Sequence, residues 1–423
     1  MLLSFHIENF KSILDVTIPL TYAEKKAPNG YKEMALYPFI EENDFRTVPI
    51  LAFYGANASG KSNIVKAFSL LTHIVRKKYN PNDFTPNKLH SNNSPIIFKL
   101  DFLKSGKEYS YALKIDDKEI IYEQLNQGEK CIFSIDNREA QFNDLTTDAY
   151  PIEKLESIFS VECLDHDKKF LTPFLTVVGS NYAGLNLFIT DAYIFLTKNL
   201  EVYGLNRFPF SYGIEKLAET NDDEGLQNAF NEVVTILRKL DIDITRMELK
   251  RNDISNNQKI NFRDNHEYVR NLKSKTFTEI EINSYHKDVN GNEIQFDFNE
   301  ESTGTQRVAC LLGIILSVLQ RGNILIIDEL GNSLHPYLFA EIVRLFKDKR
   351  YNKKNAQLIF TTHNTDIMDD DMMRVSELGI VKKTLKKGTE IKRISDFEGV
   401  RNVTSFRKQY LEGNFSGIPF PYI

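Results

Sequence analysis

The sequence predicts an α/β fold with a mixed or parallel sheet, helices on both faces and an antiparallel β subdomain. Three observations predict it. A compact apolar run at residues 48–54 leads through a glycine-rich loop into a helix at 61–75. Alternating apolar and polar residues at 96–115 indicate antiparallel strands, and the last third alternates helix and strand, as a parallel sheet requires. A chain of 423 residues can bury a large core around such a sheet.

The N-terminal segments follow in a clear order. Residues 3–10 alternate loosely like a strand, and residues 48–54 form a strand that ends in the glycine-rich turn. Apolar residues in the next segment recur at helical spacing, at Ile64, Ala67, Phe68, Leu71 and Ile74. Residues 79–95 are rich in Asn, Pro and Ser, which is typical of an exposed loop. Strands are then expected at 96–102 and 109–115.

The middle of the chain changes to a helical pattern. It is clearest at Leu226, Phe230, Val233, Val234, Leu237 and Leu240. We interpret this region as an inserted helical lid, followed by a hairpin of residues 276–285 and 293–298 joined through Asn290-Gly291. No heptad run is long enough for a coiled-coil arm. The expected segments are an N-terminal lobe at 1–183, the lid at 184–275 and a C-terminal lobe at 276–423.

Composition and charge exclude several classes of protein. The chain is 42% hydrophobic with a formal net charge of -5, which argues against a general nucleic-acid coat. Cys131, Cys163 and Cys310 are far apart and form no CxxC pair, so neither a disulfide framework nor a zinc site is expected. The most apolar run, 309–319, is too short to span a bilayer, and no signal peptide is evident. We expect a cytoplasmic protein with no membrane partner.

The strongest local signal is the segment from Gly55 to Ser62, which has the phosphate-loop pattern between a strand and a helix. Gly55 and Gly60 permit the backbone to turn its amide groups toward phosphate, and the helix N-terminus adds a positive partial charge. Lys61 is expected to reach the β- and γ-phosphates of ATP, and Ser62 to bind Mg²⁺. The alternative is a glycine turn before an ordinary helix. The further residues expected around the phosphates are Asn57, Ala58, Ser59 and Asn63.

A second signal lies far downstream, where the apolar segment 324–327 ends in Asp328 and Glu329. We expect a parallel strand beside the phosphate-loop strand, which would bring Asp328 to the magnesium ion. Glu329 would then act as general base on the attacking water. The alternative is a core strand with two acids at its exposed end.

Before that strand, the segment Glu301-Ser302-Thr303-Gly304-Thr305-Gln306-Arg307 begins an apolar helix. Two interpretations are open. Thr303 and Gln306 fit a capping box, which needs no further function. A capped helix start with Ser302 and Gly304 is also what an anion site requires.

From these residues the chain resembles the ABC ATPases, specifically the SMC, RecN and OLD-like group. The resemblance implies an ABC-ATPase head in which Ser302, Gly304 and Thr305 of one subunit contact the γ-phosphate bound by another. It also implies that residues 330–336 form the D-loop, and that His363, at the end of a strand, is the switch histidine. A strand carrying Asn9, Phe10, Lys11 and Ser12 would lie next to the nucleotide.

The chain departs from the group at several positions. Glu301 replaces the Leu of transporter signatures and Thr303 replaces a Gly, which weakens a transporter role. The glutamine that helps to hold magnesium is not assigned, although Gln124 and Gln127 are candidates. The acidic run at 369–371 is interpreted as a solvated helix end rather than a metal site.

The closing segment 410–419 resembles the tail of stand-alone bacterial ATPases of phage defence and abortive infection, the RloA-like proteins and the PARIS ATPase. This implies a sensor that controls a separately encoded effector such as a nuclease or toxin. About 60 residues follow His363, fewer than a Toprim nuclease domain needs, so we expect the nuclease on a partner. A homodimer of heads, or a higher homo-oligomer, is expected. The alternative is a DNA-maintenance ATPase of SMC or RecF type, for which nucleic acid would be a partner.

Overall fold

The computed structural model describes most of the chain in two compact units. The described residues are 1–23, 27–89, 94–143, 145, 150–204, 213, 216–217, 223–254, 267–270, 277–331, 334–368, 373–400 and 405–418. The first unit combines Met1–Leu205 with Arg321–Ile423, and the second is Asn206–Gln320. The first unit therefore joins the two ends of the chain, and the second is an insertion between them.

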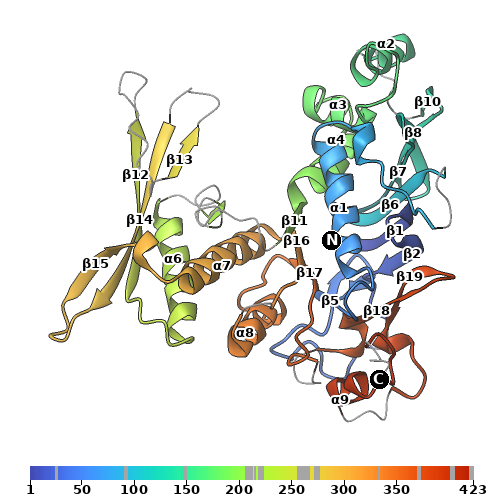
Figure 1. Ribbon diagram of the computed structural model, residues 1–423. Helices are drawn as coiled ribbons and strands as arrows, with labels where there is room; N and C mark the ends of the chain where they lie inside the picture. The colour runs from blue at the N-terminus through green and yellow to red at the C-terminus, as the bar shows by residue number, and fades with distance from the viewer. Residues whose placement is uncertain are drawn as a thin grey trace. The chain divides into compact units, whose positions relative to one another are not determined.

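Within the described residues, a 13-stranded sheet runs through the first unit (Figure 1). Its strand order is β10-β9-β8-β7-β6-β1-β2-β19-β18-β5-β17-β16-β11. The bounds are β1 Leu2–Phe10, β2 Ile13–Pro19, β5 Ile50–Tyr54, β6 Ile96–Lys104, β7 Lys107–Ile115, β8 Ile120–Gln127, β9 Lys130–Asp136, β10 Glu139–Phe142, β11 Leu200–Gly204, β16 Ile324–Asp328, β17 Gln357–Thr361, β18 Leu378–Thr384 and β19 Gly388–Arg393. A separate hairpin pairs β3 Ile40–Glu42 with β4 Phe45–Thr47.

The sheet has a parallel and an antiparallel part, which confirms the predicted mixed α/β architecture. Strands β11, β16, β17, β5 and β18 are parallel. Strands β5 and β17 are buried along their whole length, as expected of parallel strands covered on both faces. Strands β10 to β6, β1 and β2 are antiparallel, and β1 alternates buried and half-buried residues. The strands expected at 3–10, 96–102 and 109–115 are β1, β6 and β7.

Helix α1, Lys61–Arg76, packs against strands from both parts of the large sheet. It contacts β1, β11, β16 and β17, although β1 and β16 are separated by five strands in the sheet order. Helix α1 therefore packs across a wide part of the sheet. Phe68 of α1 packs on Phe5 of β1 with ring centroids 4.1 Å apart. The apolar spacing predicted for this helix forms that buried face.

The remaining helices of the first unit are shorter. The α-helices are α2 Ile152–Ile158, α3 Phe174–Asn181, α4 Leu187–Ile194, α8 Pro336–Lys347 and α9 Phe406–Leu411. Two π-helical turns, η2 Phe159–Cys163 and η3 Phe195–Asn199, continue α2 and α4. The 3-10 turns are η1 Pro81–Asp83, η6 Val375–Glu377 and η7 Ile394–Asp396.

In its described part, the second unit combines helices α6 and α7 with a small antiparallel sheet. Its described elements are α6 Asp223–Arg238, β12 Arg246–Ile254, β13 Glu267–Arg270, β14 Phe277–Lys287, β15 Glu293–Asp297, η5 Phe298–Glu300 and α7 Thr303–Arg321. Strand β14 pairs with β12, β13 and β15. The predicted hairpin is β14 with β15, and the predicted helical spacing after residue 225 is α6.

The inserted region is not the purely helical lid expected at 184–275. That segment also contains β11, which belongs to the large sheet, and β12 and β13 of the small sheet. Helical spacing ends with α6 at Arg238, and β12 begins at Arg246 with Met247 buried. Long-range pairing with β14 decides the conformation of this stretch, and the helical pattern before it carries no information on that pairing.

Helix α7 has 19 residues and is the longest helix in the described part of the chain, so no long coiled-coil arm is seen there. By length and composition it could cross a membrane, but 72% of its apolar window is buried in the structure. Burial of this kind is typical of a core helix.

Candidate functional site

The phosphate loop connects β5 to α1 at the carboxyl end of the parallel strands, and two of its glycines are required by space. A Cβ atom on Gly60 would lie 2.1 Å from Oγ1 of Thr389, and the φ angle of Gly60 is +106°. A Cβ atom on Gly55 would lie 2.2 Å from the carbonyl oxygen of Val381. The β18–β19 hairpin thus packs directly behind the loop and leaves no room for side chains there.

Lys61 begins α1 and folds over the loop. Its Nζ donates to the carbonyl oxygens of Gly55 and Ala56, at 2.7 and 2.9 Å. The residue is only 6% exposed. Burial lowers the pKa of Lys61 to about 8, against the opposing attraction of Asp328 and Glu329. The ammonium group is therefore held inside the loop, poorly solvated and ready to gain an anionic partner.

Ser62, Asp328 and Thr361 form a connected group beside the loop. The Ser62 hydroxyl donates to Oδ1 of Asp328 at 3.1 Å, and the Thr361 hydroxyl donates to the same oxygen at 2.6 Å. The Thr361 oxygen in turn accepts the backbone N–H of Glu329 at 2.7 Å. The two motifs, more than 260 residues apart in sequence, meet in one place.

The strand order corrects one expectation about this group. The strand of Asp328, β16, does not lie beside β5, because β17 lies between them. Thr361 ends this intervening strand and links Asp328 to Glu329. Thr361 belongs to none of the motifs expected from the sequence, and its signal there was its place at the end of a strand, two residues before His363.

Ser62 and Asp328 fit a magnesium ion. An octahedral site with bonds of about 2.0–2.1 Å places neighbouring ligand oxygens roughly 3 Å apart. The two oxygens here are 3.1 Å apart. Thr361 fixes the orientation of the carboxylate from behind, as partners of metal ligands commonly do.

The two predicted catalytic residues follow the ends of β16 and β17. Glu329 adopts a left-handed backbone with φ +57°, which turns the chain sharply after the strand. Partial burial, and after it the positive charge of Lys61, lower the pKa of His363, while Glu329 and Asp328 act in the opposite direction. His363 is therefore within electrostatic reach of all three residues and is neutral at physiological pH.

The N-terminal motif makes hydrogen bonds with two parts of the chain, the phosphate loop with its neighbouring hairpin and the segment that precedes β6. Ser12 accepts a hydrogen bond from Nδ2 of Asn63 at 2.7 Å and shares one with the Thr389 hydroxyl at 2.7 Å. Thr389 also donates to the carbonyl oxygen of Ser59 at 3.1 Å. Thr389 lies 377 residues from Ser12 and belongs to none of the motifs expected from the sequence.

Asn9 and Lys11 contact the segment that precedes β6. Asn9 donates to the carbonyl oxygen of Ser94 at 2.5 Å and accepts from the backbone N–H of Asn87. Lys11 donates its backbone N–H to Thr85, and burial lowers the pKa of its side chain. Asn9 therefore has a structural role at this turn, holding a loop against β1.

The signature segment lies in the second unit. Ser302 caps α7, because its Oγ accepts the backbone N–H of Thr305 at 3.1 Å and lies 2.9 Å from the Thr305 hydroxyl. This corrects the expected capping box of Thr303 and Gln306, since Gln306 instead donates to carbonyl oxygens including that of Glu301. A Cβ atom on Gly304 would meet only Oγ of Ser302, at 3.6 Å. Nothing inside the described chain requires a glycine at this position.

Other candidate residues are placed differently or are not described. Gln124 lies in β8, seven positions from β5 in the sheet order, and accepts a hydrogen bond from Tyr122. Gln127 ends the same strand. The acidic run at 369–371 and D-loop residues 332–333 lie outside the described residues, as does residue 419 of the tail.

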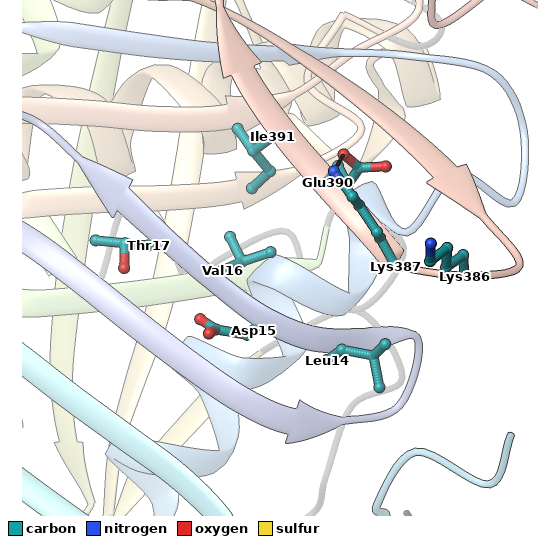
Figure 2. A pocket seen from close by; sticks show the side chains of 8 residues that line it. All are labelled: Leu14, Asp15, Val16, Thr17, Lys386, Lys387, Glu390 and Ile391. Carbon is teal, nitrogen blue, oxygen red and sulfur yellow. Dashed lines mark ion pairs between the residues drawn. The ribbon is translucent and has the colours of Figure 1, made fainter. Parts of the chain in front are cut away.

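A pocket of about 480 Å³ lies between β2 and β19 (Figure 2). These strands share a single pairing, Gly388 with Ile13, and the pocket lies beyond it. Asp15 and Thr17 line one side, and the ion pair of Lys387 with Glu390 lines the other. No motif in the sequence predicted it.

Comparisons with solved structures gave distant similarities. The SMC head domain from Thermotoga maritima has 14% identity and a TM-score of 0.42, with 93% of this chain and 98% of that chain covered. The Smc head domain with an extended coiled coil, bound to the C-terminal domain of ScpA from Pyrococcus furiosus, has 11% identity and a TM-score of 0.39, covering 92% and 95%. The recombination mediator protein RecF has 12% identity and a TM-score of 0.38, covering 93% and 98%.

No curated protein matched the chain. A protein-family comparison matched residues 50–369, about three quarters of the chain, which include the phosphate loop, the signature segment, Asp328, Glu329 and His363. The chain belongs to the family described as "AAA domain, putative AbiEii toxin, Type IV TA system".

Proposed function

We propose that the chain is an ABC-type ATPase that binds and hydrolyses ATP at a site completed by two heads. The observation that supports this best is the contact of Ser62 with Asp328 and, through Thr361, with the backbone of Glu329. The residues proposed to bind phosphate, to bind magnesium and to act as general base therefore lie at the carboxyl ends of parallel strands. This is the usual place for such sites in α/β folds.

Each residue has a defined task in this proposal. Ser62 and Asp328 hold Mg²⁺, which neutralises phosphate charge when it is bound. Lys61 turns from the carbonyl oxygens of Gly55 and Ala56 to the phosphates and regains its full charge there. Glu329 accepts a proton from the attacking water, and neutral His363 donates a hydrogen bond near the γ-phosphate.

The second head contributes the start of α7. The N-terminus of a 19-residue helix favours an anion, and Gly304 presents open backbone there. Among the described residues none requires a glycine at this position, which supports contact with a second head. Ser302 can cap its own helix and still direct its hydroxyl hydrogen outward, because the oxygen accepts the Thr305 amide.

At the level of the cell, we propose a sensor or regulator of an anti-phage, abortive-infection system, acting through a separately encoded effector. The family description names a toxin of a type IV toxin–antitoxin system, which supports a role beside a second protein. The test is a phage challenge of cells carrying the gene and its neighbour, with wild type compared to Lys61→Ala. Equal phage growth in both would contradict the defence role, and turnover stimulated by DNA would favour the DNA-maintenance alternative.

The two-head site is tested by mixing two inactive variants. Lys61→Ala removes the phosphate-loop cation, and Gly304→Arg blocks the helix start while its Cβ keeps an ordinary contact distance of 3.6 Å from Oγ of the capping Ser302. Each variant alone should lose turnover. A mixed pair contains one intact site, so mixing should restore up to about a quarter of wild-type turnover per head, since half the pairs are mixed and each has one of two sites.

Val289→Ala is a suitable control for the mixture, because Val289 is fully exposed and has no part in the proposed site. If the mixture of Lys61→Ala and Gly304→Arg stays inactive although both variants fold and pair, the site is not shared between heads.

A further inference from the structure

The residue before the helix cap, Glu301, is tied to the neighbouring sheet. Its Oε1 accepts a hydrogen bond from the Ser284 hydroxyl at 2.6 Å and lies 2.6 Å from Nε2 of His286. The Glu301 side chain is 12% exposed, and Ser284 is fully buried. Both partners come from β14, two residues apart and therefore on one face of the strand. The contact is thus a built one, with two donors aimed at one carboxylate oxygen.

The surroundings hold this contact in place. His286 packs edge-on against Phe296 of β15, with ring centroids 5.2 Å apart and the planes at 88°. The backbone of Glu301 is fixed as well, since its carbonyl oxygen accepts Nε2 of Gln306 at 2.9 Å and its N–H donates to Phe298. Glu301 therefore connects the β14–β15 hairpin to the first turn of α7.

The position of this carboxylate matters for an anion site. A carboxylate near a helix N-terminus is attracted by the helix dipole, and there it repels a phosphate and competes with it. Hydrogen bonds from Ser284 and His286 direct the charge of Glu301 toward β14. Charge-assisted bonds of this kind are the strong ones among side chains, so they can fix the direction of a flexible glutamate.

We propose that Glu301, Ser284 and His286 form a positioning cluster that orients the start of α7 for the nucleotide of a second copy of this chain. The inference rests on the proposed two-head site and assigns a role to a residue that departs from the transporter signature. Glu301 does not touch the reacting groups. It sets the direction in which Ser302 and Gly304 face, and it makes the β14–β15 hairpin an element whose displacement alters the signature.

The test compares variants of the cluster for ATP turnover and for ATP binding by a single head. Glu301→Ala and His286→Ala should each lower turnover at saturating ATP by at least about tenfold, because each removes a charge-assisted bond. ATP binding by a single head should stay unchanged, since the phosphate loop lies in the other unit. Glu301→Gln keeps an acceptor oxygen and His286→Gln keeps a donor, so both should retain turnover within about threefold of wild type.

Matched controls separate this inference from the proposal beneath it. Val289→Ala changes the fully exposed turn of the same hairpin and should behave as wild type. Gly304→Arg should be inactive if α7 of a second head completes the site. Normal turnover of both alanine variants beside inactive Gly304→Arg would overturn the positioning role alone. An active Gly304→Arg would overturn the two-head site itself.

Two further results are decisive. If Glu301→Ala lowers the affinity of a single head for ATP by the same factor as turnover, the cluster is merely structural and the inference fails. The same holds if the melting temperature falls so far that unfolding accounts for the lost turnover. If the alanine variant does not fold, His286→Ala and its rescue by His286→Gln carry the test. If His286→Ala loses turnover and His286→Gln does not restore it, the proposal is also contradicted.

Discussion

The two glycines of the phosphate loop are restricted by the β18–β19 hairpin that packs against the loop. Gly60 and Gly55 are constrained by Thr389 and by the backbone of Val381, so their small size serves packing as well as phosphate contact. Gly304 is different, because the space around it is open. No described residue requires this glycine, and a glycine in a helix lowers helix stability relative to alanine, so the proposed contact with a second head gives it a reason.

From the lowered pKa of Lys61 we predict that ATP binding depends on pH. Burial lowers its pKa to about 8, and only the protonated form can neutralise phosphate. Affinity should therefore fall by about tenfold between pH 7 and pH 9, because the fraction protonated falls by that factor. Titration calorimetry at pH 8.5 in buffers of different ionisation enthalpy should show proton uptake on binding. Affinity that is constant from pH 7 to 9 would contradict the assignment.

The same shift has a defined sign for stability. The folded pKa of Lys61 is below that of a free lysine, so the unfolded chain binds more protons above pH 8. The destabilising effect of burying this charge is therefore relieved as pH rises from about 8 toward 10.5.

At the scale of elements, helices in this protein are fixed by side chains from distant strands. Helix α3 begins on Glu123 of β8, whose carboxylate accepts the N–H groups of Phe174 and Leu175 at 2.6 and 3.1 Å and the Tyr111 hydroxyl at 2.9 Å. Helix α7 is capped locally by Ser302 and held through Glu301 by β14. Both arrangements couple the start of a helix to a sheet.

Glu123 predicts a pH-dependent stability. It is fully buried, and desolvation raises its pKa to about 7 against three opposing hydrogen bonds. Its favourable contribution is present below pH 4.5 and is lost as pH rises through about 7. Glu123→Gln should therefore become more stable relative to wild type between pH 5 and 8, by at most roughly 3 kcal/mol.

Chemical denaturation at several pH values measures this difference. Glu119→Gln is a control of opposite sign, because the hydrogen bond from Arg138 helps to lower the pKa of Glu119 even though burial acts against it. Its loss of stability should be largest at neutral pH and shrink in acid. A pH-independent difference for Glu123→Gln would mean that the carboxylate is not desolvated as described.

At the scale of the whole molecule, the two ends of the chain build one unit and the middle builds another. The residues proposed to bind nucleotide come from the first unit and the proposed signature from the second. A protein with this division can use nucleotide to bring copies together and hydrolysis to separate them, which biases whatever the second unit contacts.

Glu329→Gln predicts a trapped assembly. The variant keeps the shape of the side chain and removes the proton acceptor, so ATP should bind and persist. Particle mass should double with ATP for this variant and stay at one chain without it. Adding Gly304→Arg to the same variant should abolish the doubling. Hydrolysis by Glu329→Gln at the wild-type rate would show that Glu329 is not the base.

Several features were predictable because each one is formed by a short, continuous stretch of sequence. The strand, phosphate loop and helix around Lys61 are continuous in sequence, and the strand before Asp328 is evident from its run of apolar residues. The hairpin of β14 and β15 was evident from its turn. Local geometry decides such features, so a short stretch of sequence determines them.

Tertiary structure decided the rest. Only the strand order shows that β17 separates β5 from β16 and that Thr361 joins Asp328 to Glu329. The bond between Ser12 and Thr389 spans 377 residues, and β12 takes its conformation from β14. Such contacts depend on which distant segments pair, and that choice is made by packing of the whole chain rather than by local preference.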